Sequence, residues 1–430
     1  MYITGWSAAL ALAGAVPALF LRSTAFSWLW VLGVLALAAL DALLAPRVTS
    51  IGVRRSVPRS VRLTEETQST LELVNLGGRR ARGAVRDAWP PSAGARDNRH
   101  RYSLPAGEVA RFTTPLRPTR RGDRRAAAVT VRTEGPLRLG GRQRSLDVPT
   151  SLRVLPEFAS RKHLPARLAR LREMDGASPV LLRGAGSEFD SLREYVIGDD
   201  VRSIDWRATA RRADVVVRTY RPERDRRVVI VVDTARLSAV RVGAAPRLEA
   251  AIEAALLLSA LASRAGDRVQ IIAFDRVERA RAAGTTAEKL MPAAASALAV
   301  IEPSLVETDW KGVVQLIQER VSQRSLVVLL TAVDTAMIDS GALRAVAALQ
   351  REHQVLVGSV ADPDLAQMLL GRDSVEEVYT AAAAARTGLE NDAIVNRLRS
   401  SGAEVVVAPP DDIAPGVADA YLALKASGRL

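Results

Sequence analysis

Oxygen-bearing side chains stand at the ends of apolar, β-branched stretches in the C-terminal half of this 430-residue chain. Asp233, Asp275, Thr331 and Asp362 each end or closely follow such a stretch. If the stretches are parallel strands, their carboxyl ends share one edge of a sheet, which is where open α/β sheets place their sites. A hydrolase or a nucleotide-binding enzyme would use this edge, with Asp233 and Thr308 forming a polar pocket.

The sequence lacks the motifs that usually carry catalysis. It holds no Cys, which excludes disulfides, thiolate catalysis and cysteine metal sites. His100, His163 and His353 are scattered and form no ligand pattern. No Gly-x-x-x-x-Gly-Lys-Ser/Thr phosphate loop and no Gly-x-Ser-x-Gly elbow occurs. The adjacent carboxylates Asp199 and Asp200 are typical of a solvated turn. We therefore expect a protein that is not an enzyme.

A stretch dense in charge, residues 186–233, leads into the first of these strands. Its first part has apolar side chains at helical spacing, which predicts a short helix with one face on a core. These side chains are Phe189, Leu192, Tyr195 and Val196. Residues 198–200 predict a turn, and Val201, Ile204 and Trp206 are the next expected anchors. Residues 215–220 and 228–232 are apolar and β-branched, as strands are.

The same stretch resembles the bacterial proteins of the domain of unknown function 58 (DUF58), marked by F-D-x-L-R-x-Y-x-x-G-D-x-x-R-x-I-D-W-x-A-x-A-R. The matching residues are Phe189, Asp190, Leu192, Arg193, Tyr195, Gly198, Asp199, Arg202, Ile204, Asp205, Trp206, Ala208, Ala210 and Arg211. The resemblance covers residues 186–275 directly and the rest of the chain more loosely. It implies a partner, because relatives are associated with MoxR-type AAA+ ATPases, which are thought to remodel or mature other proteins.

The charged side chains of this motif have two possible roles. They either contact the partner or lock the first strands of the domain that follows, because opposite charges at such spacing also pair locally. The candidates are Asp190, Arg193, Glu194, Asp199, Arg202, Asp205 and Arg211. The sequence leaves both roles open.

Strands and helices alternate after residue 227. The predicted strands are 228–233, 268–274, 325–331, 354–360 and 404–407. The predicted helices are 247–265, 287–301, 310–321, 342–352, 374–400 and 414–424. Fully apolar strands between amphipathic helices predict a doubly wound, Rossmann-type parallel sheet with helices on both faces.

This half is similar to a von Willebrand factor A domain, the fold that the family resemblance implies after the charged motif. In metal-binding members the first strand ends in D-x-S-x-S, and later loops supply a threonine and an aspartate. Asp233 matches the first position, Thr308 matches the threonine, and Asp334 stands two residues beyond the expected aspartate. The two serine positions are Ala235 and Leu237, so the implied site lacks oxygen ligands that a hard cation needs. No cofactor is expected, and Mg²⁺ at Asp233, Thr308 and Asp334 is the alternative that the sequence leaves open.

Two apolar runs open the chain. Residues 3–21 and 25–44 each have the length needed to cross about 30 Å of hydrocarbon, which predicts a transmembrane helical hairpin. One arginine lies between the runs, whereas five follow the second: Arg47, Arg54, Arg55, Arg59 and Arg62. The positive-inside rule then places both ends of the hairpin and the bulk of the chain in the cytoplasm, at the cell membrane.

Short β-rich runs, cut by Gly and Pro about every ten residues, extend from residue 51 to about 155. They predict a small antiparallel, Ig-like sandwich. Residues 47–162 hold 25 Lys and Arg against 10 Asp and Glu, whereas the whole chain carries +13. The arginines indicate a solvated surface, attraction to anionic lipid headgroups, or nucleic-acid binding. No nucleic-acid-binding pattern accompanies the charge, so no such partner is expected.

The sequence thus predicts a multidomain chain: a transmembrane hairpin (1–46), a basic β domain (47–158), a linker helix with the charged motif (159–226) and an α/β domain (227–430). The predicted function is that of a membrane-anchored adaptor that works with a MoxR-type ATPase in protein remodelling or maturation. The alternative is a membrane-bound α/β enzyme acting near Asp233. An outward-facing adhesion receptor is opposed by the distribution of arginines.

Overall fold

The fold is that of a computed structural model, which describes residues 1–21, 23–176, 188–196, 199–212, 214–221, 226–284 and 286–430. The chain divides into two compact units, Met1–Glu157 and Phe158–Leu430. Each unit has its own hydrophobic core.

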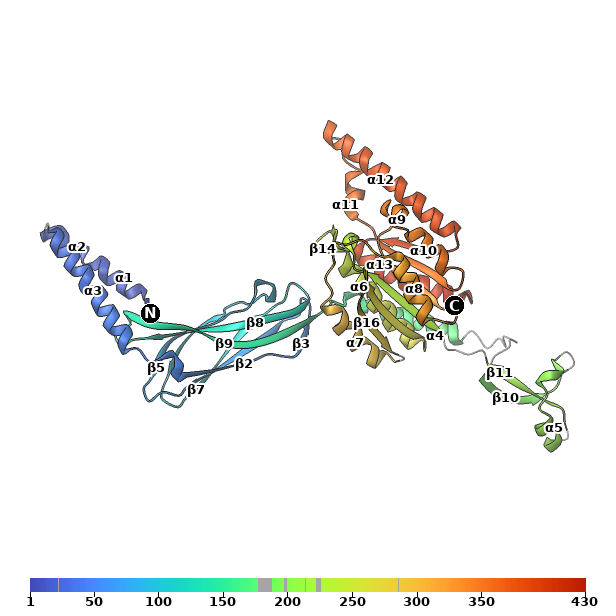
Figure 1. The fold of residues 1–430 in the computed structure, drawn as a ribbon, viewed down its shortest axis with the longest axis horizontal. Helices are drawn as coiled ribbons and strands as arrows, with labels where there is room; N and C mark the ends of the chain where they lie inside the picture. The colour runs from blue at the N-terminus through green and yellow to red at the C-terminus, as the bar shows by residue number, and fades with distance from the viewer. Residues whose placement is uncertain (22, 177–187, 197–198, 213, 222–225, 285) are drawn as a thin grey trace. The chain divides into compact units, whose positions relative to one another are not determined.

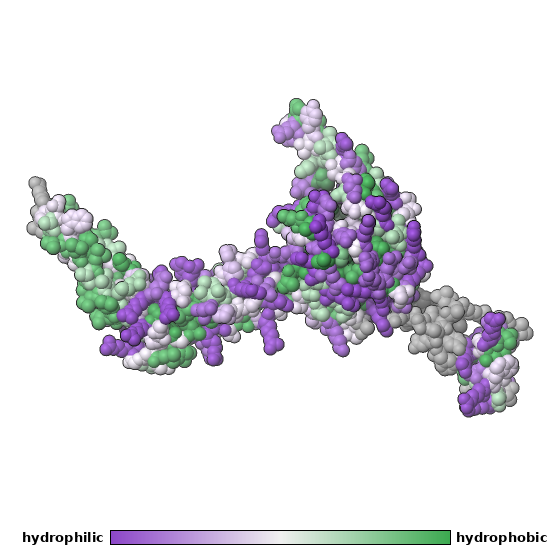
Figure 2. Space-filling model, in the orientation of Figure 1, coloured by the Kyte–Doolittle hydropathy of each residue, from purple (hydrophilic) through white to green (hydrophobic). Residues whose placement is uncertain are grey.

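An apolar pair of helical arms opens the N-terminal unit (Figures 1 and 2). Helices α1 (Gly5–Ala13) and α2 (Ala15–Leu21) form the first arm, and α3 (Thr24–Leu44) forms the second. The segment Thr24–Ser50 is the one helix in the described residues that is long and apolar enough to cross a membrane. The first arm is shorter than the predicted span, because residues Tyr2–Ile3 form strand β1 instead.

A β sandwich follows the helical pair (Figure 1). The larger sheet has the order β1-β9-β8-β5-β6, with β3 beside β9, and the smaller sheet has the order β2-β4-β7. The bounds are β2 (Ile51–Ser56), β3 (Ser60–Arg62), β4 (Thr67–Asn75), β5 (Ala81–Asp87), β6 (Arg99–Leu104), β7 (Val109–Leu116), β8 (Gly122–Glu134) and β9 (Gly140–Leu155). Leu71 and Leu73 of one sheet pack with Val129 and Val131 of the other, and all four are fully buried.

Arg55 crosses the inside of this sandwich. Its guanidinium pairs with Asp87 at 2.8 Å, donates to the carbonyls of Ala126 and Val148, and lies 5.5 Å from the centre of the Trp89 ring. Every hydrogen bond here compensates for the water that the buried charge has lost. Arg55 is therefore not among the arginines that can reach a lipid headgroup, although the sequence groups it with them.

The carboxylate of Asp41 fastens α3 to the sandwich. Asp41 lies one turn before the end of α3 and is 1% exposed. It accepts the backbone N–H groups of Leu137 and Leu139 at 2.8 Å and of Gly140 at 3.0 Å. These residues belong to the β8–β9 turn, which we define as residues 135–140.

The first helical arm holds the same turn from the other side. Thr4 donates its hydroxyl to the carbonyl of Arg138, and Ser7 donates to that of Leu139. Strand β1 pairs antiparallel with β9, with Tyr2 opposite Gly141. Both ends of the helical pair therefore join the same end of the sandwich.

The C-terminal unit is built on a six-stranded sheet with the order β16-β15-β12-β17-β18-β19. Five strands are parallel, as predicted: β12 (Arg227–Asp233), β15 (Arg268–Phe274), β17 (Leu326–Leu330), β18 (Gln354–Val360) and β19 (Glu404–Ala408). The sequence missed the antiparallel edge strand β16 (Glu278–Gly284), because its alternating arginines resemble an exposed loop.

Helices cover both faces of this sheet (Figure 1). One face packs against α4 (Leu164–Gly176), α6 (Arg247–Arg264), α7 (Ala287–Ala299) and α13 (Pro410–Ala426). The other packs against α8 (Trp310–Arg320), α9 (Ala336–Asp339), α10 (Ala342–Leu349) and the end of α12 (Val375–Ser400), while α11 (Pro363–Met368) precedes α12. The doubly wound α/β architecture expected from the alternating pattern is therefore present.

The charged motif forms a strand where a helix was predicted. Strand β10 (Glu188–Glu194) pairs antiparallel with β11 (Val216–Arg221), and α5 (Trp206–Arg212) lies between them in the sequence. We call residues 188–221 the motif hairpin. The predicted helix over 189–196 is wrong because the apolar spacing of so short a run fits a strand as well as a helix. Pairing with β11 supplies the backbone hydrogen bonds that favour the strand.

We predict that Asp41→Ala loosens the β8–β9 turn. The change removes the acceptor of three N–H groups, two of them buried, at a cost of about 3 kcal/mol and hence roughly 100-fold faster local opening. Hydrogen exchange of the peptide covering residues 135–140 measures this opening. Leu40→Ala is the matched control, since Leu40 is 54% exposed. Equal exchange in both variants would show that Asp41 does not hold the turn.

Candidate functional site

Asp233 ends β12 at the carboxyl edge of the sheet, and three hydrogen bonds hold its carboxylate. The hydroxyl of Thr308 donates to Oδ1 at 2.9 Å, and that of Thr331 donates to Oδ2 at 2.7 Å. The N–H of Ala235 donates to Oδ1 at 3.0 Å. Parallel pairing of β12 with β17 brings these residues together from distant parts of the sequence. Asp233 is 3% exposed, so its carboxylate lies inside the fold.

A cavity of about 240 Å³ lies beside this group. Its walls include the apolar side chains of Trp310 and Met337. Glu307 also lines it and pairs with Arg236 at 3.1 Å, with both side chains more than half exposed. Pockets for drug-sized ligands hold about 300–1,000 Å³, so this one suits a single side chain or a similarly small group.

The residues at this edge do not fit a divalent cation. Asp233 and Thr308 lie together, but Asp334 does not line the cavity and instead accepts the N–H of Ala336 at 3.0 Å. Across the described residues, no three His, Asp or Glu side chains gather as metal ligands. A hard cation needs about six oxygen ligands, and the carboxylate of Asp233 is already engaged by protein donors.

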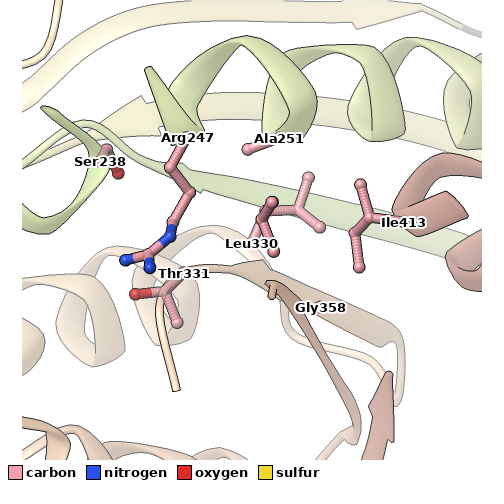
Figure 3. Close-up of a pocket in the computed structure, with 8 residues that line it drawn as sticks. Ser238, Arg247, Ala251, Leu330, Thr331, Gly358 and Ile413 are labelled. Carbon is pink, nitrogen blue, oxygen red and sulfur yellow. The ribbon is translucent and has the colours of Figure 1, made fainter. Parts of the chain in front are cut away.

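Arg247, the first residue of α6, brings a positive charge to this region. Figure 3 shows its guanidinium reaching toward Thr331, and Nη1 donates to the carbonyl of Leu237 at 3.2 Å. Burial lowers the pKa of this guanidinium, and nearby carboxylates oppose that shift. Those carboxylates belong to Asp334, Asp362 and Asp233. Arg247 thus places a positive charge near these three carboxylates, where a bound metal cation would also have placed one.

Sequence reasoning missed Arg247, although a signal was present. A cation in the first turn of a helix opposes the helix dipole, so an arginine there needs a nearby acidic partner. It also placed Thr331 at a strand end without identifying it as the hydroxyl that holds Asp233. That contact depends on the register of β12 against β17, which no local pattern encodes.

Ion pairs within the motif hairpin stabilise its own fold. Arg193 pairs with Asp199 at 2.6 Å, and Asp205 pairs with Arg218 at 2.8 Å. Hydrogen bonds from the amide of Ala208 and from the Arg218 guanidinium lower the pKa of Asp205. Three of the predicted contact candidates, Arg193, Asp199 and Asp205, therefore have partners inside the hairpin.

Several side chains predicted as buried anchors are exposed instead. Trp206, Val201 and Val196 are 66%, 59% and 57% exposed. The prediction is wrong because a two-stranded hairpin is too small to bury them. The exposed charged candidates are Glu194, Arg202 and Arg211, and the half-buried motif residues are Leu192, Tyr195 and Ile204. Gly198 lies outside the described residues, as do the side chains of Phe189 and Asp190.

Comparisons with known proteins match this part of the chain. Residues 191–396 match the family described as "Protein of unknown function DUF58", which confirms the resemblance over that range. The uncharacterized proteins Mb1516 of Mycobacterium bovis and Rv1480 of Mycobacterium tuberculosis are each 26% identical to this chain over 185 residues. The matched segment is 43% of this chain and 57% of each relative, so this chain spans little more than half of their length.

The matches to solved structures cover a smaller share of this chain. The CARDB domain of the PF1109 protein from Pyrococcus furiosus, solved in complex with di-metal ions, is 18% identical, with a TM-score of 0.19. That match covers 24% of this chain and 91% of the domain. A FixG-related protein from Vibrio parahaemolyticus is 12% identical, with a TM-score of 0.16, and the match covers 24% of this chain and 96% of that one.

We predict opposite pH signatures for two neighbouring carboxylates. Burial raises the pKa of Asp233, so its contribution to the free energy of unfolding is full below its ordinary pKa and falls as pH rises through the folded value. Burial of Asp275 is outweighed by hydrogen bonds from Ser304 and two amides, which lower its pKa. Its contribution is full above the ordinary pKa and falls on acidification.

Denaturant unfolding of the detergent-solubilised chain, from about pH 3 upward to span the ordinary Asp pKa of about 3.9, measures both effects. Asp233→Asn should remove the loss of stability on the alkaline side, and Asp275→Asn should remove the loss on the acid side. Each variant is the control for the other. Identical pH profiles for the two would contradict the assignment.

We also predict that Mg²⁺ leaves the thermal stability of the protein unchanged. A ligand that binds only the folded state raises the melting temperature with concentration, and the group around Asp233 offers no such site. Thermal unfolding with Mg²⁺ or with EDTA tests this. A Mg²⁺-dependent rise that Thr308→Val abolishes would overturn it.

Proposed function

Since residues 191–396 form the DUF58 region of this chain, we propose that the protein is a membrane-anchored adaptor for a MoxR-type AAA+ ATPase. The motif hairpin binds the ATPase, and the helical pair holds the complex at the cytoplasmic face of the cell membrane. The ATPase then remodels or matures a client protein. This proposal assigns the chain a binding role and no chemical step of its own.

One observation carries the proposal: the motif hairpin exposes apolar side chains that its own fold cannot bury. Trp206 is 66% exposed and stands near Val201 in the sequence, with the exposed Arg202 between them. Tryptophan and arginine are the residue types most enriched where binding energy concentrates. Exposed apolar side chains beside charged ones also suit a surface that a partner covers.

The paired charges of the hairpin support the same role. The pairs Arg193–Asp199 and Arg218–Asp205 hold the backbone in one conformation before a partner arrives. A preorganised surface loses less conformational entropy on binding. We therefore divide the motif into residues that shape the hairpin and residues that meet the ATPase.

The helical pair supports anchoring at a membrane. Its second arm has the length and apolarity of a span, and both arms return to the same end of the sandwich. That arrangement suits a hairpin that enters and leaves the bilayer on one side. The arginines after α3 favour the cytoplasm as that side.

The α/β unit has the strand and helix order that we associate with a von Willebrand A-like domain. The cavity beside Asp233 is a second binding surface, which admits a small side chain of the client protein. Since the residues there do not fit a divalent cation, we propose that this domain binds its client without a metal.

We predict that Trp206→Ala and Arg202→Ala each lower recovery of the ATPase about tenfold or more, as loss of a binding hot spot of about 2 kcal/mol implies, without changing the melting temperature. Affinity purification of the tagged, solubilised protein followed by mass spectrometry measures recovery. Arg207→Ala is the matched control, since Arg207 is exposed and stands at a variable position of the motif.

Arg193→Ala separates the two roles within the motif. It should lower recovery together with the stability of the hairpin, because it removes the guanidinium that pairs with Asp199. Full recovery with Trp206→Ala, or the absence of any AAA+ ATPase from the wild-type sample, would refute the proposed function.

A further inference from the structure

Three turns meet at the end of the sandwich that joins the helical pair. The turn after β4 is tied to the segment after α3, since the N–H of Leu76 donates to the carbonyl of Ser50 at 2.8 Å. The turn between β6 and β7 lies beside it, because the N–H of Gly107 donates to Asn75 at 2.8 Å. The β8–β9 turn is held by Asp41. We call residues 75–80, 105–109 and 135–140 together the helix-proximal end.

The exposed apolar side chains of the sandwich gather at this end. Between residues 48 and 155, all of which are described, the large apolar side chains that are exposed are Leu76, Val109 and Leu137. They are 71%, 55% and 57% exposed. Apolar side chains that are exposed together at one end of a domain are typical of a surface that meets a membrane or a partner.

Positive charge surrounds these side chains. Arg79, Arg80 and Arg138 are exposed in the same turns. The acidic residues at this end are Glu108, which is exposed, and Glu134, which is half-buried. Leucine with flanking arginine is the composition of segments that lie in the headgroup layer of a membrane, and each arginine near an anionic leaflet favours binding.

The β8–β9 turn also reaches back along the helical pair. A Cβ on Gly140 would lie 2.2 Å from the carbonyl oxygen of Ala38, so the two backbones are in close contact. Ala38 stands six residues before Leu44, the last residue of α3. At about 1.5 Å per residue, the turn therefore overlaps the final ~9 Å of the helix. If α3 spans a bilayer, the tip of the turn lies at the depth of the headgroups.

We propose that the helix-proximal end is a membrane-contact surface, with Leu76 and Leu137 in the headgroup layer and the adjoining arginines on the phosphates of anionic lipids. The inference rests on the anchoring in the proposed function and goes beyond it. An anchor alone lets the sandwich tilt freely, whereas this contact holds its end on the bilayer. The occupant is an anionic lipid surface.

The absence of cysteine from the chain gives a direct test. Single cysteines at Leu76→Cys and Leu137→Cys are labelled with an environment-sensitive fluorophore in the full-length protein, reconstituted into phosphatidylcholine vesicles with or without phosphatidylglycerol. Thr119→Cys is the matched control, since Thr119 is exposed and precedes β8, at the opposite end of the sandwich. Lipids brominated near the headgroup serve as contact quenchers.

We expect blue-shifted emission and several-fold stronger quenching at positions 76 and 137 than at position 119, with the largest effect in anionic vesicles. Arg79→Gln combined with Arg138→Gln should reduce quenching at position 76. Equal quenching at all three positions, or no dependence on anionic lipid, would overturn the inference.

Carbonate extraction of the same vesicles separates this test from the proposed function. Protein that resists carbonate but shows equal quenching at all three positions is anchored without the contact, so only the inference fails. Protein that carbonate removes is not anchored, and then the proposed function fails together with the inference.

Discussion

The N-terminal unit depends on one buried carboxylate. Asp41 is the single acidic residue in α3, and leaving it unpaired in an apolar helix would cost several kcal/mol. The β8–β9 turn supplies three N–H donors that compensate for the lost water. The carboxylate of Asp41 and the N–H groups of the turn thus join the end of the helix to the end of the sandwich.

Much of the fold could be predicted because its elements carry strong local patterns. The five parallel strands and six major helices of the α/β unit follow from fully apolar runs between amphipathic segments, and the motif residues follow from the resemblance to the DUF58 proteins. Three features could not be predicted. Arg55 resembles any other arginine until the sandwich closes around Asp87. The β10 strand needs its partner β11, which lies more than twenty residues away. The hydroxyl of Thr331 reaches Asp233 only through strand register.

The strand-end group holds the carboxylate of Asp233 with donors from the protein itself. In the expected pattern a metal would hold the carboxylate of Asp233, whereas here Thr308, Thr331 and an amide hold it with neutral donors. Burial without a full positive charge raises the pKa of Asp233, and the more distant Arg247 moderates the negative potential of the edge. Ala235 and Leu237 carry no side-chain oxygen, so the donors that the structure places on the carboxylate of Asp233 are two hydroxyls and one amide.

Size explains why the motif hairpin behaves differently from both larger units. A two-stranded hairpin with one short helix has too little area on any face to bury a tryptophan, so Trp206 remains exposed however well the ion pairs around it form. In the sandwich and the α/β unit, by contrast, apolar side chains are covered by a second layer. The ion pairs order the hairpin and leave its largest apolar side chain, Trp206, exposed, which is the property that the proposed adaptor role uses. Leu76 and Leu137 of the helix-proximal end are also exposed, and in the proposed membrane contact the lipid surface covers them.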